Sequence, residues 1–135
     1  MNQLTDLEIA WLAGFMEGEG YFAITTQGYP KIQCASTDED TLWKLYELLG
    51  VGTLNVHNEA GYRSQNRRAC YILDVVGSQA VPVMEAILPY MCSRRADKIR
   101  GIIERERGRV YKKRKPSPIM TRQQWLQKIG LDKAA

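Results

Sequence analysis

The chain has 135 residues, of which 44% are hydrophobic, so it is long enough for one domain with a single buried core. No apolar run reaches the roughly 20 residues that cross a bilayer, and the acidic start of the chain is unlike a signal or transit peptide. We therefore expect a soluble, cytoplasmic protein with no membrane partner. Three isolated cysteines, Cys34, Cys70 and Cys92, lack the paired spacing of a zinc site and suit a reducing compartment.

The net charge of +4 is distributed unevenly along the chain. Residues 1–62 hold 2 basic and 9 acidic side chains, whereas residues 63–135 hold 17 basic and 6 acidic ones. Eleven Lys and Arg residues but only 3 acids lie within residues 94–115. Such a block is typical of a surface that binds a polyanion such as nucleic acid. The alternative interpretation is a solvated helix followed by a disordered basic tail.

The first half of the chain predicts a helix, two strands and a second helix. Thr5 and Glu8 form a capping-box pattern ahead of a helix over residues 6–18. Alternating polarity then predicts strands over residues 20–27 and 31–36. The inward positions of these strands are Phe22, Ile24, Ile32 and Cys34. A helix capped by Thr37 or Asp38 follows and ends at Gly50. Its buried stripe is Leu42, Leu45, Leu48 and Leu49.

The second half repeats two strands and then turns helical. Alternation predicts strands within residues 51–58 and 67–76, joined by a polar loop. Their inward positions are Leu54, Val56, Ala69, Tyr71, Leu73 and Val75. Ser78 is a candidate cap for a helix that continues to about Leu88. A basic helix over residues 93–108 packs through Ile99, Ile102 and Ile103. A linker then leads to a short helix near residues 121–129, which has a second capping box and an apolar stripe of Trp125, Leu126 and Ile129.

This order predicts an α+β fold with a four-stranded antiparallel sheet and helices on one face. The other face would be polar, which fits either plain solvent surface or a surface that binds a polar ligand. The neighbouring basic helix favours the second interpretation. The large aromatic side chains at helical spacing, Trp43, Tyr46 and Trp125, are expected to pack in the core rather than to stack on bases.

Gly14 and Gly18 need an explanation, because a glycine inside a helix costs about 1 kcal/mol relative to alanine. They lie four residues apart on one helix face, with Ala10 above them, and their missing side chains would let a second backbone come close. An isolated chain has no second helix of this kind, but a twofold dimer does. The crossing would bring both Glu19 carboxylates to the symmetry axis. A divalent cation between them would relieve their repulsion, which predicts a magnesium site with oxygen ligands.

The stretch "LAGFMEGEG", residues 12–20, resembles the LAGLIDADG motif of the homing endonucleases. The order of helices and strands resembles that family over roughly residues 5–110. The resemblance implies the family's αββαββα fold with a saddle-like sheet, in an endonuclease core over residues 1–110. Residues 111–135 would be a basic linker and a short C-terminal helix. A single motif resembles the homodimeric branch, whose members are encoded by bacteria, phages or organelles.

The resemblance also implies roles for individual residues. Glu19 matches the metal-binding catalytic carboxylate, and the carbonyl oxygen of Gly20 matches a second metal ligand. The metal would be Mg²⁺, with Mn²⁺ or Ca²⁺ able to substitute. The dimer interface would comprise Ala10, Ala13, Gly14, Glu17 and Gly18. Ser36 matches a polar residue at the exit of the second strand. Arg94 is the best match for the basic residue that borders the attacking water, and Arg95 and Lys98 are the next candidates. An arginine would position water or stabilise the phosphorane, because it does not lose its proton.

The function implied is that of a site-specific homing endonuclease. The homodimer would bind a long pseudo-palindromic DNA site, with the outer sheet face in the major groove, and hydrolyse one phosphodiester in each strand. The expected DNA contacts are Tyr21, Thr25, Gln27, Lys31, Gln33, Thr53, Asn55, His57, Arg63, Arg67, Arg68, Asp74, Lys112, Lys113, Arg114 and Lys115. The alternative is a non-catalytic nucleic-acid-binding protein on the same scaffold, either a transcriptional regulator or an RNA maturase with an intron RNA as partner. The carboxylate at Glu19 favours the nuclease.

Overall fold

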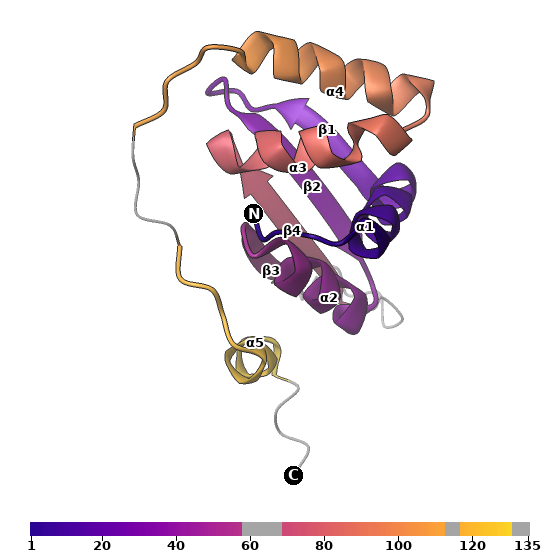
Figure 1. Cartoon of the computed structure of the whole chain (residues 1–135). Coiled ribbons are helices and arrows are strands. Elements are labelled where there is room, and N and C mark those ends of the chain that lie inside the picture. Colours follow the sequence, from indigo (N-terminus) through magenta and orange to yellow (C-terminus); the bar gives the residue numbers. More distant parts are fainter. Residues whose placement is uncertain (58–68, 113–116, 131–135) are drawn as a thin grey trace.

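The helices and strands follow one another in the order that the sequence predicts (Figure 1). The computed structural model describes residues 1–57, 69–112 and 117–130. Its elements are α1 (Asp6–Glu19), β1 (Gly20–Ile24), β2 (Pro30–Ser36), α2 (Glu39–Leu49), β3 (Thr53–His57), β4 (Cys70–Val76), α3 (Ala80–Ile87), α4 (Ser93–Glu106) and α5 (Arg122–Ile129). Short 3₁₀ turns, η1 (Gly77–Gln79) and η2 (Leu88–Tyr90), flank α3. The α+β class and the αββαββα order are confirmed.

The four strands form one antiparallel sheet in the order β1-β2-β4-β3, so β2 and β4 are central and β3 is an edge strand. The register aligns Tyr21, Gln33, Asp74 and Thr53 in one row across the sheet. Because side chains alternate along a strand, this whole row faces one side of the sheet. All four of these side chains are partly or fully exposed, so this outer face is uncovered in the single chain.

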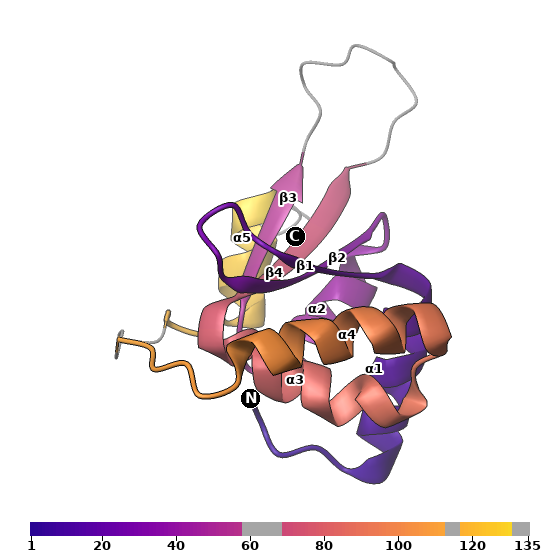
Figure 2. The same ribbon diagram turned by 90° about the horizontal axis from the view of Figure 1, so that it is seen from above.

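The inner face of the sheet packs on α1 to α4 (Figures 1 and 2). The inward strand residues form the core with the apolar faces of these helices, and those most deeply buried are Ile32, Cys34, Leu54, Leu73 and Val75. In α2 the stripe differs by one position, because Tyr46 is buried and Leu48 is only partly buried. The side chain of Trp125 in α5 is fully buried and meets the ring of Tyr71 edge-on at 6.1 Å. The predicted packing roles of Tyr46 and Trp125 are confirmed.

The strand predicted over residues 20–27 is shorter in the structure and ends at Ile24. Thr25 and Gln27, which we expected on the outer sheet face, lie instead in the turn that leads to β2. The N–H of Thr25 donates to the carbonyl of Tyr29 at 2.7 Å, and its hydroxyl accepts from the N–H of Tyr29 at 3.0 Å. Gly28 adopts φ of +87°, which closes the turn. These local bonds end the strand although the alternating pattern continues.

One predicted helix cap is wrong, and another is right only in its position. Ser78 lies inside η1, and α3 begins at Ala80 without a side-chain cap. Asp38 occupies the cap position of α2, but its side chain makes no cap hydrogen bond. In contrast, both capping boxes are present, Thr5 with Glu8 and Thr121 with Gln124. Among the described residues, no helix combines the length and the apolar character that a membrane crossing requires.

Candidate metal and nucleic-acid site

The junction between α1 and β1 places Glu19 and Gly20 at the edge of the core. The N–H of Gly20 caps α1 by donating to the carbonyl of Met16. A Cβ atom at Gly20 would lie 2.6 Å from that carbonyl oxygen and 3.1 Å from the ring of Phe22. Gly20 is therefore required by close packing within the chain. The side chain of Glu19, the last residue of α1, is exposed to solvent.

Packing against the described residues does not require glycine at Gly14 and Gly18. Both are exposed, and a Cβ atom built at either one meets nothing within 4 Å. Ala10 is exposed on the same helix face, and Leu7, one turn earlier, is 84% exposed. This face of α1, which we call the glycine face (Leu7, Ala10, Gly14 and Gly18), is apolar and uncovered. Ala13, which we also expected at the interface, lies instead in the core at 3% exposure.

Glu17 points in a different direction from Glu19. Its carboxylate accepts a hydrogen bond from the N–H of Cys92 at 3.2 Å and pairs with Arg95 at 3.9 Å. Cys92 is the N-cap of α4 and its own side chain makes no cap bond, so Glu17 supplies the negative charge at this helix start. Glu17 therefore joins the end of α1 to the start of α4. Arg95, which we expected beside the reacting water, contacts Glu17, whereas Arg94 and Lys98 are exposed.

The charge of Glu19 acts on the centre of the sheet. Burial raises the pKa of the Cys34 thiol to about 12, and the negative charges of Glu19 and Asp74 add to this rise. Cys34 is paired with Gly20 across β1 and β2, which explains the closeness of Glu19. Cys34 is itself a buried packing residue, and its sulfur lies 3.3 Å from that of Met16.

The outer sheet face contains a polar cluster in its central row. The side-chain amide of Gln33 donates to a carboxylate oxygen of Asp74 at 2.8 Å, and the ammonium group of Lys31 lies 3.7 Å from the same oxygen. Tyr21, in the same row, is 60% exposed. Thr53 and His57 are exposed on the edge strand. The central row of this face therefore presents several hydrogen-bonding groups to solvent.

No family model and no curated protein matches this chain. Solved structures do match its fold. One is the homing endonuclease I-CvuI in complex with its target in the presence of calcium, with a TM-score of 0.58 and 20% identity over 73% of this chain and 64% of that one. A second I-CvuI complex, with uncleaved I-CreI target and magnesium, gives a TM-score of 0.56 at the same identity and coverage. This chain has the fold of the LAGLIDADG homing endonucleases.

A third solved structure extends the likeness to an archaeal protein. The intron-encoded homing endonuclease I-Vdi141I, complexed with DNA, has a TM-score of 0.52 and 17% identity over 73% of this chain and 68% of that one. This chain spans about two thirds of the length of I-CvuI, since its match covers 64% of that protein. At these identities the likeness establishes the LAGLIDADG fold but not the roles of individual residues.

Within this fold, the residues expected around the metal do not all meet. Ser36 lies on the inner side of β2, and its hydroxyl accepts from the N–H of Asp38 at 3.0 Å, so it shapes the turn into α2. Where the chain is described, no three His, Cys, Asp or Glu side chains gather into a metal-binding group. Carboxylate and carbonyl oxygens are ligands that Mg²⁺ accepts, so Glu19 and Gly20 fit such an ion by donor type.

The start of the basic segment is anchored to the turn between β1 and β2. Glu106 is buried at 7% exposure and accepts hydrogen bonds from Arg109, at 3.1 and 3.2 Å, and from Tyr111. Arg109 also donates to the carbonyl of Gly28, and its guanidinium stacks 4.9 Å from the ring of Tyr29. Lys112, the next basic residue, is exposed. The turn and the basic segment are therefore held together at one end of the sheet.

Several expected DNA contacts lie outside the described residues, and one residue that contacts an outer-face side chain was not expected. Six of the expected residues lie outside the described residues: Arg63, Arg67, Arg68, Lys113, Arg114 and Lys115. The residue missed is Lys128 of α5, whose ammonium group donates to the side-chain oxygen of Asn55 at 3.2 Å. One sequence feature indicates this contact: Lys128 follows Trp125 by three residues, so both lie on the same side of the terminal helix.

Proposed function

We propose that this chain is a homodimeric endonuclease that binds a long pseudo-palindromic DNA site and makes a double-strand break by hydrolysis that depends on a divalent metal. The observation that carries the proposal is the uncovered glycine face of α1, which ends at the exposed carboxylate of Glu19. None of the described residues lies within 4 Å of a Cβ atom built at Gly14 or Gly18, whereas packing against Met16 and Phe22 accounts for Gly20.

The glycine face supports a twofold dimer. Helix axes normally lie 8–10 Å apart, and the distance is shorter where side chains are absent at the crossing. A face that meets its own copy must be self-complementary, as a flat stripe of small residues is. Leu7, at 84% exposure, would be covered by the same contact. Because α1 ends one residue after Gly18, the crossing brings the two Glu19 side chains together at the axis.

Glu19 and Gly20 supply the oxygens for the metal in this proposal, one set from each protomer. When bound there, Mg²⁺ would lower the pKa of its water and offset charge on the phosphate. Arg94 and Lys98 are exposed on α4, the helix that Glu17 joins to the end of α1. In this proposal they would hold a phosphate or orient the attacking water. Arg95 acts on Glu17 and so positions α1 relative to α4.

The outer sheet face is the DNA-reading surface of the proposed enzyme. Its polar side chains are amides, hydroxyls and charged groups, the types that recognise base edges in the major groove, and they lie among the apolar side chains of Ile72 and Val76. The basic segment that begins at the end of α4 would bind phosphates, which add affinity without sequence information. The solved structures with the same fold are complexes with target DNA, which supports this assignment.

The decisive test replaces Glu19 with glutamine. Selection from a library of random duplexes first defines the site that the wild-type protein binds. We expect Glu19→Gln to bind that site with unchanged affinity and to lose double-strand cleavage in Mg²⁺, because the amide has the same shape and no charge. Glu85→Gln is the matched control, since Glu85 is an exposed glutamate on α3, away from the proposed axis. Cleavage that survives in Glu19→Gln would remove the catalytic assignment, and a wild-type protein that binds but never cuts would indicate a non-catalytic binding protein.

A further inference from the structure

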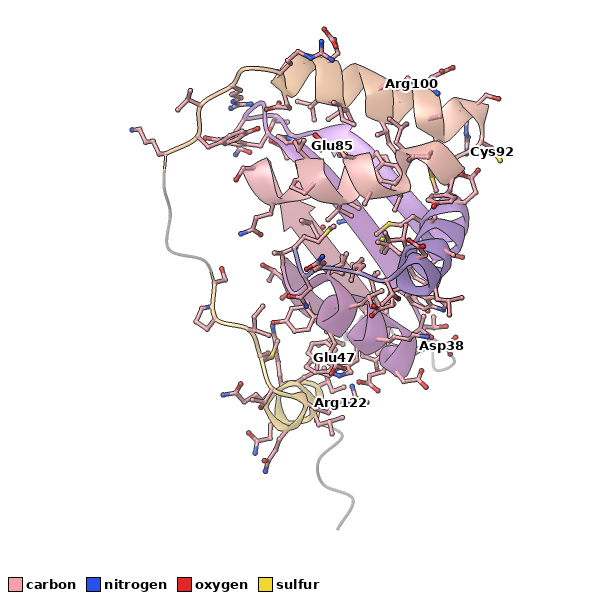
Figure 3. All side chains as sticks on the ribbon, viewed as in Figure 1. Asp38, Glu47, Glu85, Cys92, Arg100 and Arg122 are labelled. Carbon is pink, nitrogen blue, oxygen red and sulfur yellow. The ribbon has the colours of Figure 1, made fainter. Side chains whose placement is uncertain are left out.

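The terminal helix α5 is firmly attached to the core. Trp125 is fully buried, and its indole N–H donates to the carboxylate of Glu39 in α2 at 2.7 Å. The guanidinium of Arg122 makes two hydrogen bonds to the same carboxylate, and it lies between α5 and α2 (Figure 3). The N–H of Met120 donates to the hydroxyl of Tyr46 at 2.7 Å. These contacts fix where α5 lies beside β3 (Figure 2).

Lys128 extends from α5 across the edge of the sheet. Its ammonium group donates to the carbonyl of Leu54 at 3.0 Å and to the side-chain oxygen of Asn55 at 3.2 Å. Leu54 faces the core, so Asn55, the next residue along β3, faces the outer side of the sheet. The charge of Lys128 therefore lies at the β3 edge of the sheet, beside the outward-facing side chain of Asn55, although the helix that bears it is anchored on α2.

The chemistry of the partners fixes the orientation of two amide side chains. An ammonium group can only donate, so the atom of Asn55 that faces Lys128 is its oxygen. Its NH₂ group points elsewhere and donates to none of the described residues, so it can serve a ligand. A carboxylate can only accept, so Gln33 turns its NH₂ toward Asp74 and leaves its oxygen for a ligand. The outer face thus presents donors at the β3 edge and an acceptor at its centre.

We infer that Asn55 and Lys128 form a donor pair that selects guanine in the major groove, once in each half-site. The inference rests on the proposed function and specifies which base this part of the surface reads. Guanine presents two acceptors in the major groove, N7 and O6, whereas cytosine presents a donor and adenine presents one of each. The NH₂ of Asn55 and the ammonium of Lys128 match the two acceptors. Gln33 presents an acceptor at a different position, and it matches the amino group of cytosine or adenine.

The experiment measures base preference in the duplex that the wild-type protein selects. Competition binding in Ca²⁺ compares the four bases at each position of the half-site for the wild type, Lys128→Met, Asn55→Asp and Lys44→Met. Lys128→Met keeps the aliphatic stem and removes the charge. Asn55→Asp keeps the shape but replaces the free donor with an acceptor. Lys44→Met is the matched control, because Lys44 is an exposed lysine that covers the ring of Trp11 on the helical side of the sheet.

We expect one position per half-site at which the wild type prefers guanine by about 5-fold to 150-fold, the range of a good pair of base contacts. Lys128→Met should reduce that preference at this position alone, and Asn55→Asp should move it toward cytosine, while Lys44→Met changes nothing. Uniform weakening at every position by Lys128→Met would mean that Lys128 binds only phosphate, and unchanged preferences would mean that it only covers the β3 edge. Either result overturns the inference and leaves the endonuclease proposal standing. A wild-type protein that selects no duplex would remove both.

Discussion

Replacing Gly14 with leucine tests the proposed dimer, because the change should stabilise a monomer and destabilise a dimer. In the single chain a Cβ atom at Gly14 meets nothing within 4 Å, so a leucine side chain has open space. Leucine also favours the helix over glycine by about 0.8 kcal/mol. A protein that acts as a monomer should therefore be stabilised slightly by the change.

In the proposed dimer the same substitution inserts a side chain between two closely packed helices. Overpacking a tight contact costs about 1–3 kcal/mol, and a twofold interface contains the substitution twice, which gives roughly 2–6 kcal/mol for the dimer. At about 1.4 kcal/mol for each factor of ten, the dissociation constant of the dimer should rise by roughly 30-fold to 10⁴-fold. Sedimentation velocity over a series of protein concentrations measures this constant directly.

Gly101 provides a close control for that measurement. It lies in α4, which like α1 has 14 residues, at the ninth position, the same place that Gly14 occupies in α1. It is also exposed, and a Cβ atom there meets nothing within 4 Å. Gly101→Leu should leave the dissociation constant unchanged and raise stability toward urea. If Gly14→Leu behaves like Gly101→Leu, the helix crossing at the glycine face is wrong.

Two further predictions concern the C-terminal part of the chain. Trp125→Ala should lower the free energy of unfolding by about 3–5 kcal/mol, because it removes a fully buried indole that also donates to Glu39. Urea denaturation measures this change, and a loss below about 1 kcal/mol would mean that α5 is not held by the core. A variant with glutamine at four basic positions, Lys112, Lys113, Arg114 and Lys115, should bind DNA with a weaker salt dependence. The slope of log affinity against log salt concentration should fall by up to about 4, since each phosphate contact contributes about 0.9. An unchanged slope would show that this segment does not bind DNA.

Most of the fold was predictable because its signals are local. Both capping boxes involve residues three apart, and each forms as the sequence indicates. The inward positions of the strands follow from alternation, which the burial of Ile32, Leu54 and Leu73 confirms. The motif over residues 12–20 resembles that of the LAGLIDADG homing endonucleases, and this resemblance implied the fold that the structure has.

The errors arise where individual side-chain and backbone contacts, rather than the hydrophobic pattern, decide the outcome. The alternating pattern continues past Ile24, yet hydrogen bonds between Thr25 and Tyr29 end the strand. Lys128 gave no clear signal because its partner, Asn55, is 73 residues away in the sequence. The same limit applies to the two acids of the motif, since the partners of Glu17 lie on α4, about 75 residues further along. Sequence spacing alone could not separate a structural acid from an available one.

The different environments of Glu17 and Glu19 bear directly on how the proposed dimer tolerates its own charge. Residues two apart on a helix do not share a face, so the two carboxylates can have separate surroundings. With both acids at the axis, two protomers would bring four negative charges together. The pairing of Glu17 with Arg95 and with the N–H of Cys92, the N-cap of α4, offsets two of these charges inside the protomers. The two that are left, one Glu19 from each chain, match the charge of a single divalent cation. In the proposed dimer, neutralising Glu17 within each protomer would therefore let a metal, rather than mutual repulsion, decide whether the helix ends come together.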